Sequence, residues 1–307
     1  MLFERDGEKF EFGKDFRGPN KAVVKITRTN SLYLSAALAS EHDSLSAVAS
    51  FFANGLWISR TRQDQGDLTL TNRLLSSDGD AGGKVRALLR YADVGIEDAV
   101  VRNAEVTEKM MGFLSRIVDV VMEREDEDET ASEQRRQELL DVARSRQEVH
   151  LVHSAEKQGT TIPFDQESLG TQSWYALIGP ILVCLEGGST LVVDELDASL
   201  HPMLLAQAIA LFQDRELNKL GAQLVFTAHD TTPVGTLLGE VALGREQVWL
   251  TEKDRAGSSH LTPISDFSPR KGENLQRGYL QGRYGGTPRL RPLALKAAFS
   301  DALAEDE

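Results

Sequence analysis

Beyond residue 148 the apolar positions change between two spacings, which predicts strands that alternate with helices. Residues 173–185 repeat apolar side chains at three- and four-residue steps, and residues 202–220 follow a similar pattern from a proline in the first turn. Pro180 should remove one backbone hydrogen bond from the first of these helices. The predicted strands are residues 148–154, 190–193 and 223–227. Strands this apolar, separated by helices, indicate a buried and largely parallel sheet that is covered by helices.

The first hundred residues have a less regular pattern. Residues 9–12 and 22–27 lie between turn signals and are predicted strands of a small antiparallel sheet. Residues 31–60 carry a rough apolar stripe that predicts a helix. A glycine-rich loop over residues 79–83 is expected to precede another helix over residues 84–91.

Domain boundaries follow from a change in composition. Residues 106–121 have the apolar face of a helix, and residues 123–129 then hold six acids among seven positions, which is typical of a solvated hinge. We therefore predict a β-rich and helical lobe over residues 1–104, a helical arm with an acidic hinge over 105–147, and a C-terminal lobe over 148–307.

Composition narrows the function classes. The 307 residues include 34 basic and 47 acidic side chains, a net charge of −13, so no global basic field attracts nucleic acid or anionic lipid, although a local patch could bind DNA. The single cysteine, Cys184, excludes an intramolecular disulfide framework and a cysteine-rich zinc site. No run of 18 apolar residues and no signal peptide occurs, so we expect a cytoplasmic protein without a membrane-spanning helix.

The sharpest chemical signal follows the strand predicted over residues 190–193. Asp194 and Glu195 come directly after it, at the carboxyl edge of the sheet, where open α/β sheets bind their ligands. Asp194 is placed to hold Mg²⁺, through water, and Glu195 to polarise a water that attacks a γ-phosphate. The alternative is a strand that ends in solvated acids.

Two further segments belong with this acidic pair. His229 follows the next strand, and a parallel pairing would bring it to the same sheet edge, where a histidine can hydrogen-bond a γ-phosphate or position water. Ser168, Gly170 and Thr171 precede the long predicted helix and offer hydroxyl and N–H groups to an anion. An ordinary helix N-cap would use the same residues.

The order of these motifs resembles the ABC-type ATPase superfamily, and more narrowly the AAA-family ATPases of bacterial abortive-infection and anti-phage systems. In that group the signature reads Glu-Ser-x-Gly-Thr, as in residues 167–171 here, and the Walker B strand runs into Asp-Glu-Leu-Asp-x-Ser-Leu-His-Pro, as in residues 194–202. Residues 279–288 are similar to the closing segment of the family. The likeness covers about residues 148–290 and extends more loosely to residues 1–105.

The resemblance implies an α/β ABC-type ATPase head, with a sheet like that of P-loop NTPases and flanking helices, that binds ATP and Mg²⁺ between two heads. It implies that Asp194 serves Mg²⁺, that Glu195 is the catalytic base, and that His229 is the switch histidine. Asp197 would lie in the loop that communicates across the dimer. The residues implied to contact the nucleotide of the partner head are Ser168, Gly170 and Thr171. The implied partners are a second head, in a homodimer or hetero-oligomer, and a separate effector in phage defence.

The sequence contains no Gly-x-x-x-x-Gly-Lys-Ser/Thr motif. Residues 79–85 come nearest, but they have three residues instead of four before Gly-Lys, and Val85 stands where the magnesium-binding hydroxyl should be. A glycine-rich turn that caps the next helix is the expected structure there. Without the phosphate cradle of a P-loop we expect this chain to be inactive alone. A start that lies after the P-loop, a decayed gene, and a subunit that lends its signature to a partner all remain open.

Two other function classes compete with an ATPase. The first is a non-catalytic regulatory or assembly subunit in which the remaining motifs only shape an interface. The second is a DNA-binding module that uses the basic residues between Arg270 and Lys296, among them Arg283 and Arg289. A solvated basic surface is the commoner structure for such a segment.

Overall fold

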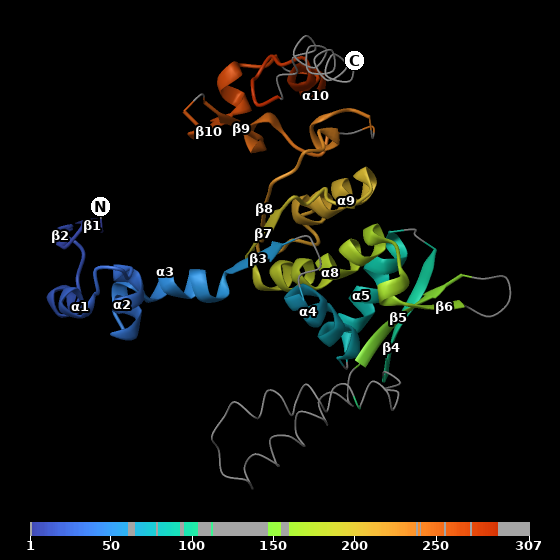
Figure 1. Ribbon diagram of the computed structural model, residues 1–307, viewed down its shortest axis with the longest axis horizontal. Coiled ribbons are helices and arrows are strands. Elements are labelled where there is room, and N and C mark those ends of the chain that lie inside the picture. The colour runs from blue at the N-terminus through green and yellow to red at the C-terminus, as the bar shows by residue number, and fades with distance from the viewer. Residues whose placement is uncertain are drawn as a thin grey trace, which may run out of the picture. The chain divides into compact units, whose positions relative to one another are not determined.

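Figure 1 shows a computed structural model of the chain, in which two compact units are distinguished: residues 1–204 with 211–228, and residues 205–210 with 229–307. The structure describes residues 2–60, 65–77, 79–92, 95–103, 112, 147–154, 160–237, 239, 241–254, 256–270 and 272–287. The predicted helical arm and acidic hinge over 105–147 therefore lie almost wholly outside the described residues, and the predicted domain boundaries stay predictions.

A three-stranded parallel sheet in the order β3–β7–β8 positions the candidate site in the first unit. Its strands are β3 (Leu56–Arg60), β7 (Thr190–Asp194) and β8 (Gln223–Phe226). The predictions of β7, of β8 and of their parallel pairing are confirmed. The assignment of residues 56–60 to a helix was wrong, since they form β3. A run of only three apolar residues, Leu56 to Ile58, continues a helical stripe as easily as it begins a strand, so only its pairing with β7 reveals β3.

One face of this sheet is covered by α8 (Leu169–Gly187), which contacts β3 and β7. Leu191 and Val193 of β7 point to that face and are about 1% exposed. α4 (Gln65–Ser76) also packs against α8, and the carboxylate of its buried Asp67 accepts hydrogen bonds from the Trp57 indole and the Ser59 hydroxyl of β3. The prediction that helices cover the sheet is thus confirmed for this face.

The proline within α8 is compensated by a threonine of α4. Pro180 has no N–H to donate to the carbonyl of Ala176, four residues earlier. The Thr71 hydroxyl lies 3.2 Å from that carbonyl oxygen, and it also accepts the Gly179 N–H at 3.0 Å. The same hydroxyl lies 3.0 Å from the Asp67 carbonyl of its own helix, so its one proton is shared between two buried acceptors.

A second, antiparallel sheet has the order β4–β5–β6, formed by β4 (Ile96–Asn103), β5 (Gln147–His153) and β6 (Thr160–Pro163). The strand predicted over 148–154 is thereby confirmed. α5 (Asp80–Tyr91) precedes β4. Its N-cap is Gly79, whose φ of +128° is a backbone conformation that glycine adopts easily. The loop predicted over residues 79–83 is therefore mostly the first turn of α5, because an N-cap glycine allows the helix to start earlier.

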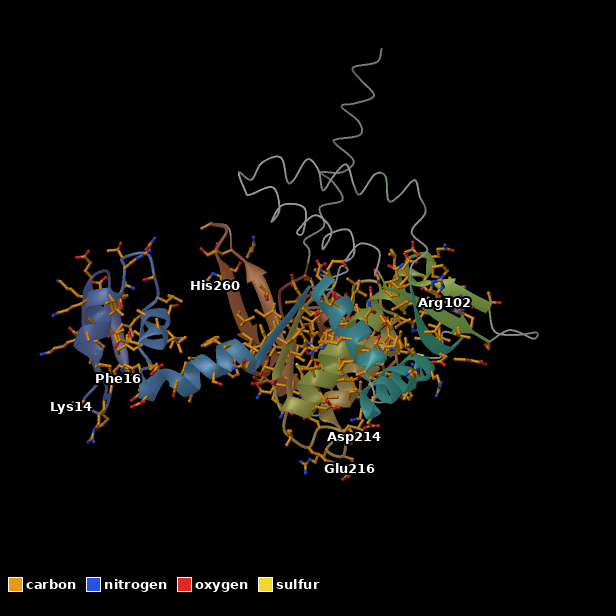
Figure 2. The ribbon with its side chains drawn as sticks, turned by 90° about the horizontal axis from the view of Figure 1, so that it is seen from below. Lys14, Phe16, Arg102, Asp214, Glu216 and His260 are labelled. Carbon is orange, nitrogen blue, oxygen red and sulfur yellow. The ribbon has the colours of Figure 1, made fainter. Side chains whose placement is uncertain are left out.

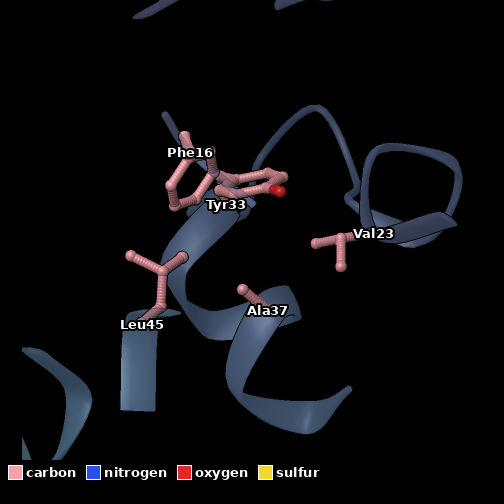
Figure 3. Packing of buried hydrophobic residues seen from close by; sticks show 5 residues of the cluster. All are labelled: Phe16, Val23, Tyr33, Ala37 and Leu45. Atoms are coloured by element: carbon pink, nitrogen blue, oxygen red, sulfur yellow. The ribbon is translucent and has the colours of Figure 1, made fainter. Parts of the chain in front are cut away.

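The N-terminal segment consists of a hairpin and three helices: β1 (Phe3–Asp6), β2 (Lys9–Phe12), α1 (Asn20–Ile26), α2 (Tyr33–Ala39) and α3 (Asp43–Asn54). The strand predicted over residues 9–12 is confirmed and the strand predicted over 22–27 is wrong. Val23 instead lies on one face of α1 and is fully buried with Phe16, Tyr33, Ala37 and Leu45 (Figure 3). This packing outweighs the β-propensity of the adjacent valines.

α9 (Pro202–Gln213) spans the boundary between the two units and is shorter than the helix predicted over 202–220. Asp214 ends it: its carboxylate accepts the backbone N–H of Glu216 at 2.7 Å, in a turn that replaces the helical hydrogen bonds (Figure 2). The sequence periodicity continues past this point because Leu217 and Leu220 keep the helical spacing.

The second unit contains the hairpin of β9 (Trp249–Lys253) and β10 (Ser259–Pro263), followed by α10 (Leu275–Leu280). The described residues also include the short 3-10 turns η1 (Phe164–Gln166), η2 (Thr232–Val234), η3 (Arg245–Gln247) and η4 (Ile264–Phe267). Ile264, Leu275 and Tyr284 form the buried cluster of this unit. Within the part of the chain that the structure describes, no helix is long and apolar enough to cross a membrane.

Candidate functional site

The carboxyl edge of the parallel sheet brings Asp194, Glu195 and Thr227 together. Thr227 directly follows β8, and its backbone N–H donates to the carbonyl of Val193 at 3.1 Å, which continues the β7–β8 pairing by one step. This register places the Thr227 side chain beside Asp194, where its hydroxyl donates to Oδ1 at 2.6 Å. The same hydroxyl oxygen accepts the backbone N–H of Glu195 at 2.8 Å. One threonine thus holds both members of the acidic pair.

Glu195 adopts a left-handed backbone conformation, with φ of +52°. For a residue with a Cβ this conformation costs about 1–2 kcal/mol. It turns the chain sharply at the strand end: the Leu196 N–H donates to the Thr227 carbonyl at 2.9 Å, and the Leu196 side chain is only 1% exposed. The turn leaves Asp194 exposed and Glu195 half-buried, so solvent reaches both residues.

The oxygen atoms at this edge suit Mg²⁺. A carboxylate beside a hydroxyl is a hard-oxygen environment, which that ion prefers, and it usually takes only one or two protein carboxylates along with water and substrate phosphates. Among the residues that the structure describes, no group of three or more His, Cys, Asp or Glu forms a ready metal cage. The arrangement fits an ion held by Asp194 and completed by other ligands.

The predicted signature residues lie at the start of α8. Ser168 is its N-cap: the serine hydroxyl accepts the Thr171 N–H at 3.1 Å and lies 2.9 Å from the Thr171 hydroxyl. Ser168 is exposed, Gly170 is half-buried and Thr171 is buried. The N-cap interpretation of these residues is therefore confirmed, and of the two hydroxyls only that of Ser168 belongs to an exposed residue.

The signature segment contacts the loop that follows the acidic pair. A Cβ added to Gly170 would lie 2.9 Å from the carbonyl oxygen of Ser199, so only glycine fits. Ser199 itself has φ of +65°, and the half-buried Asp197 lies two residues before it. The structure thus links three predicted elements, since residues 168–171, residues 197–199 and the Asp194–Glu195 pair belong to one compact unit.

The predicted switch histidine belongs to the other compact unit of the chain. His229 is exposed, two residues beyond Thr227, and it belongs to the second compact unit. Its place in the site therefore stays a prediction.

Sequence reasoning also missed the residue that fixes Glu167. His153 of β5 contacts the Glu167 carboxylate at 2.6 Å, and that side chain is only 6% exposed. Glu167 directly precedes the N-cap Ser168, so this pair anchors the entry to α8. No local pattern could have found it, because the two residues are fourteen apart and on different elements.

Lys84, the lysine of the false P-loop, has structural partners. Its ammonium group lies 2.8 Å from both Asp80 and Glu186, and these hydrogen bonds raise the pKa of the lysine above its usual value. Only Gly79 caps the helix, and Asp80 to Val85 are already its first turns.

A family model described as "AAA domain, putative AbiEii toxin, Type IV TA system" matches residues 3–232. The chain belongs to this family, which confirms an AAA/ABC-type ATPase domain of the abortive-infection kind. The match spans the signature segment, the acidic pair and His229. No curated protein matches the chain.

Proposed function

We propose that this chain provides the hydrolytic residues of an AAA/ABC-type ATPase. Its nucleotide-binding site is completed by a P-loop from polypeptide beyond these 307 residues. The observation that carries the proposal is the Thr227 hydroxyl, which donates to Asp194 and accepts from Glu195 at the carboxyl edge of a parallel sheet. This edge is where open α/β sheets bind ligands, and family membership supplies the substrate class.

Each residue then has a role. Asp194 holds Mg²⁺, an ion that neutralises charge on the β- and γ-phosphates. Glu195 accepts a proton from the attacking water, and the Thr227 hydroxyl fixes its backbone N–H at the sheet edge. His229 contacts the γ-phosphate, the role that the family resemblance implies for it. Ser168, Gly170 and Thr171 present the start of α8, with its N–H groups and positive dipole end, to the nucleotide of a partner head.

Assembly follows from this division of labour. Because the signature segment and the acidic pair of one head serve different nucleotides, two heads are required, in a homodimer or a hetero-oligomer. ATP binding would close the heads and hydrolysis would release them. A separate effector would respond to that movement in an abortive-infection setting.

A non-catalytic regulatory subunit is the second candidate, and one observation favours it. The 307 residues contain no P-loop motif, and Lys84, the nearest candidate, is engaged by Asp80 and Glu186. In that case the acidic pair and the N-cap of α8 would only shape an interface.

Calorimetry with ATP and Mg²⁺ separates the two candidates. We would titrate the 307-residue chain and a longer polypeptide that includes any P-loop encoded upstream, each with the Glu195→Gln variant. The proposal expects binding by the longer polypeptide alone, and retention of unhydrolysed ATP in its Glu195→Gln variant. If neither polypeptide binds ATP, the non-catalytic candidate is favoured. If the Glu195→Gln variant still hydrolyses ATP, a residue other than Glu195 is the catalytic base.

A further inference from the structure

A pocket lined mainly by leucines lies within the first compact unit. Three segments form its walls: α5, the last two turns of α8, and the turn between α9 and β8. Its cavity volume is about 500 Å³, inside the range of about 300–1,000 Å³ that is typical of small-molecule sites. Its apolar lining includes Leu88, Leu182, Leu185, Leu211, Leu217 and Leu220. We call it the leucine pocket.

The leucine pocket is separate from the candidate nucleotide site. Ser168 begins α8 and Leu182 follows fourteen residues later, so the two are about 21 Å apart along the helix axis. Leu220 comes shortly before the first residue of β8, at the amino edge of the parallel sheet, whereas Asp194 ends β7 at the carboxyl edge. A small ligand in this pocket therefore cannot reach the acidic pair.

The turn between α9 and β8 is fixed in place and presents two leucines to the pocket. Leu217 is 54% exposed and Leu220 is 63% exposed. Asn218 lies between them, and its side-chain amide donates to the carbonyl of Phe212 at 2.7 Å and to that of Ala222 at 2.8 Å. Because this asparagine holds the turn, both leucines line the pocket instead of burying each other.

The three walls are also tied to one another. A Cβ added to Gly188, at the end of α8, would lie 2.8 Å from the carbonyl oxygen of Leu220, so the turn packs directly on the helix end. On the other side, the Trp174 indole of α8 donates to the carbonyl of Leu88 in α5 at 3.0 Å. The leucine pocket is thus formed before any ligand arrives, as small-molecule sites usually are.

Two lysines stand at the rim, and they differ in their partners. The Lys84 ammonium lies 2.8 Å from both Asp80 and Glu186, so these acids neutralise its charge. Lys219 is exposed and forms no ion pair with any residue that the structure describes. An apolar pocket with such a cation at its rim suits a molecule that joins an apolar chain to an anionic head.

The size of the pocket favours a small molecule over a protein helix. An α-helix is about 10 Å across and rises about 5.4 Å per turn, so a cavity of about 500 Å³ holds little more than one turn. A methylene group takes about the space of a water molecule in the liquid, about 30 Å³. A chain of about ten carbons therefore occupies about 300 Å³ and leaves its head at the rim.

We infer that the leucine pocket is a binding site for a free medium-chain acyl carboxylate. The chain of about ten carbons packs among the leucines, and the carboxylate contacts the Lys219 ammonium group. This site lies beyond the proposed function, because neither ATP nor Mg²⁺ takes part in it.

Thiol labelling locates the ligand in the 307-residue chain. Cys184 is the only cysteine, it is buried, and burial raises its pKa to about 11, so it reacts poorly at neutral pH. We would label Leu220→Cys with a maleimide, with and without sodium decanoate. Leu261→Cys in β10 is the matched control, since Leu261 is also 63% exposed and lies in the other unit.

We expect rapid labelling of both variants without decanoate. At ten times its Kd, decanoate should slow the labelling of Leu220→Cys about tenfold and leave Leu261→Cys unchanged. Slow labelling of Leu220→Cys without decanoate would show that another part of the chain, or a second copy if it depends on protein concentration, covers the pocket. Labelling that decanoate leaves unchanged, or slows equally in both variants, would place no ligand there. Each of these results overturns the inference.

Calorimetry tests the recognition of the head. Decanoate should bind the parent once per chain, and decyltrimethylammonium, which has the same chain and the opposite charge, should bind more weakly. Lys219→Gln should weaken decanoate binding about threefold, the effect of a solvent-exposed ion pair. Lys253→Gln, at an exposed lysine of β9, should leave it unchanged. Equal binding of the two amphiphiles, or no effect of Lys219→Gln, would contradict a site for a carboxylate.

These measurements need no nucleotide, so their outcome is independent of the proposed function. Decanoate binding without any Mg²⁺-dependent ATP binding would retain the leucine pocket and contradict the ATPase. ATP binding by the longer polypeptide, with no decanoate binding, would do the reverse.

Discussion

The Thr227 hydroxyl lies 2.6 Å from Oδ1 of Asp194 and 2.8 Å from the backbone nitrogen of Glu195. It donates to the carboxylate and accepts from the N–H, so a single oxygen atom fixes the Asp194 side chain and the backbone turn at Glu195. Thr227 can do this because β8 pairs with β7 in a register that aligns Phe226 with Val193. The acidic pair is thus positioned by a neighbouring strand and not by its own strand alone.

Two substitutions of Thr227 should separate the contribution of its hydroxyl group to stability from that of its methyl group. Thr227→Val removes both hydrogen bonds and should lower the free energy of unfolding by about 1–2 kcal/mol, because each contributes about 0.5–1.5 kcal/mol net. Thr227→Ser keeps the hydroxyl and should stay close to the parent. Urea denaturation measures both. A loss in Thr227→Ser with none in Thr227→Val would mean that the methyl group, and not the hydroxyl, is what matters.

Backbone strain at Glu195 predicts that glycine is more stable there than alanine. Glycine adopts a φ of +52° without a Cβ clash, so Glu195→Gly should exceed Glu195→Ala in unfolding free energy by about 1 kcal/mol. Both variants lose the carboxylate, which makes alanine the control for side-chain removal. The comparison uses chemical denaturation of the two proteins side by side. An alanine variant as stable as the glycine variant would contradict a strained turn.

Thr71 and Pro180 should be energetically coupled. Thr71→Val leaves the buried Gly179 N–H and Ala176 carbonyl without their partner, which should cost about 2–4 kcal/mol. Pro180→Ala restores an N–H that can bond the Ala176 carbonyl, so the same valine substitution should cost about 1 kcal/mol less in that background. A double-mutant cycle of thermal or urea unfolding gives the coupling. Additive effects would show that Thr71 does not replace the bond lost at the proline.

Two glycines should respond to alanine in opposite directions. Gly170→Ala places a Cβ 2.9 Å from the Ser199 carbonyl oxygen and should destabilise the unit by about 1–3 kcal/mol. Gly83 lies at an exposed position of α5 with nothing within 4 Å of its added Cβ, so Gly83→Ala should stabilise by about 0.5–1 kcal/mol. The unfolding free energies of the two variants test this contrast. Stabilisation by Gly170→Ala would refute the close approach of the two segments.

The sequence predicted those parts of the fold whose signal is local. The apolar runs of β7 and β8 end in turn residues or acids, and Ser168 begins a long apolar helix. The acidic pair and the signature segment were therefore predicted together with the strand and the helix that carry them. β3 was missed because its residues extend a helical stripe, and residues 22–27 because the burial of Val23 in an aromatic cluster outweighs strand propensity.

The partners of the candidate site were less predictable than its carboxylates. Strand pairing was expected, but the residue beside Asp194 depends on a register that the sequence does not specify, and a shift of two residues separates Thr227 from His229. The contact between His153 and Glu167 joins β5 to the start of α8, and no regular spacing in the sequence relates these two residues. Such relationships arise from tertiary packing and become visible only in the folded chain.

The most direct test of the account is the Mg²⁺ dependence of ATP affinity in the longer polypeptide that supplies the P-loop. Calorimetry would compare the parent with Asp194→Asn, and with Glu216→Gln as a control, since Glu216 is an exposed acid in the turn after α9 (Figure 2). We predict that Asp194→Asn weakens ATP binding in Mg²⁺ by at least about tenfold, or about 1.4 kcal/mol, with no change in its absence and no effect of Glu216→Gln. Identical titrations for Asp194→Asn and the parent would contradict a metal role for this carboxylate and, with it, the hydrolytic site.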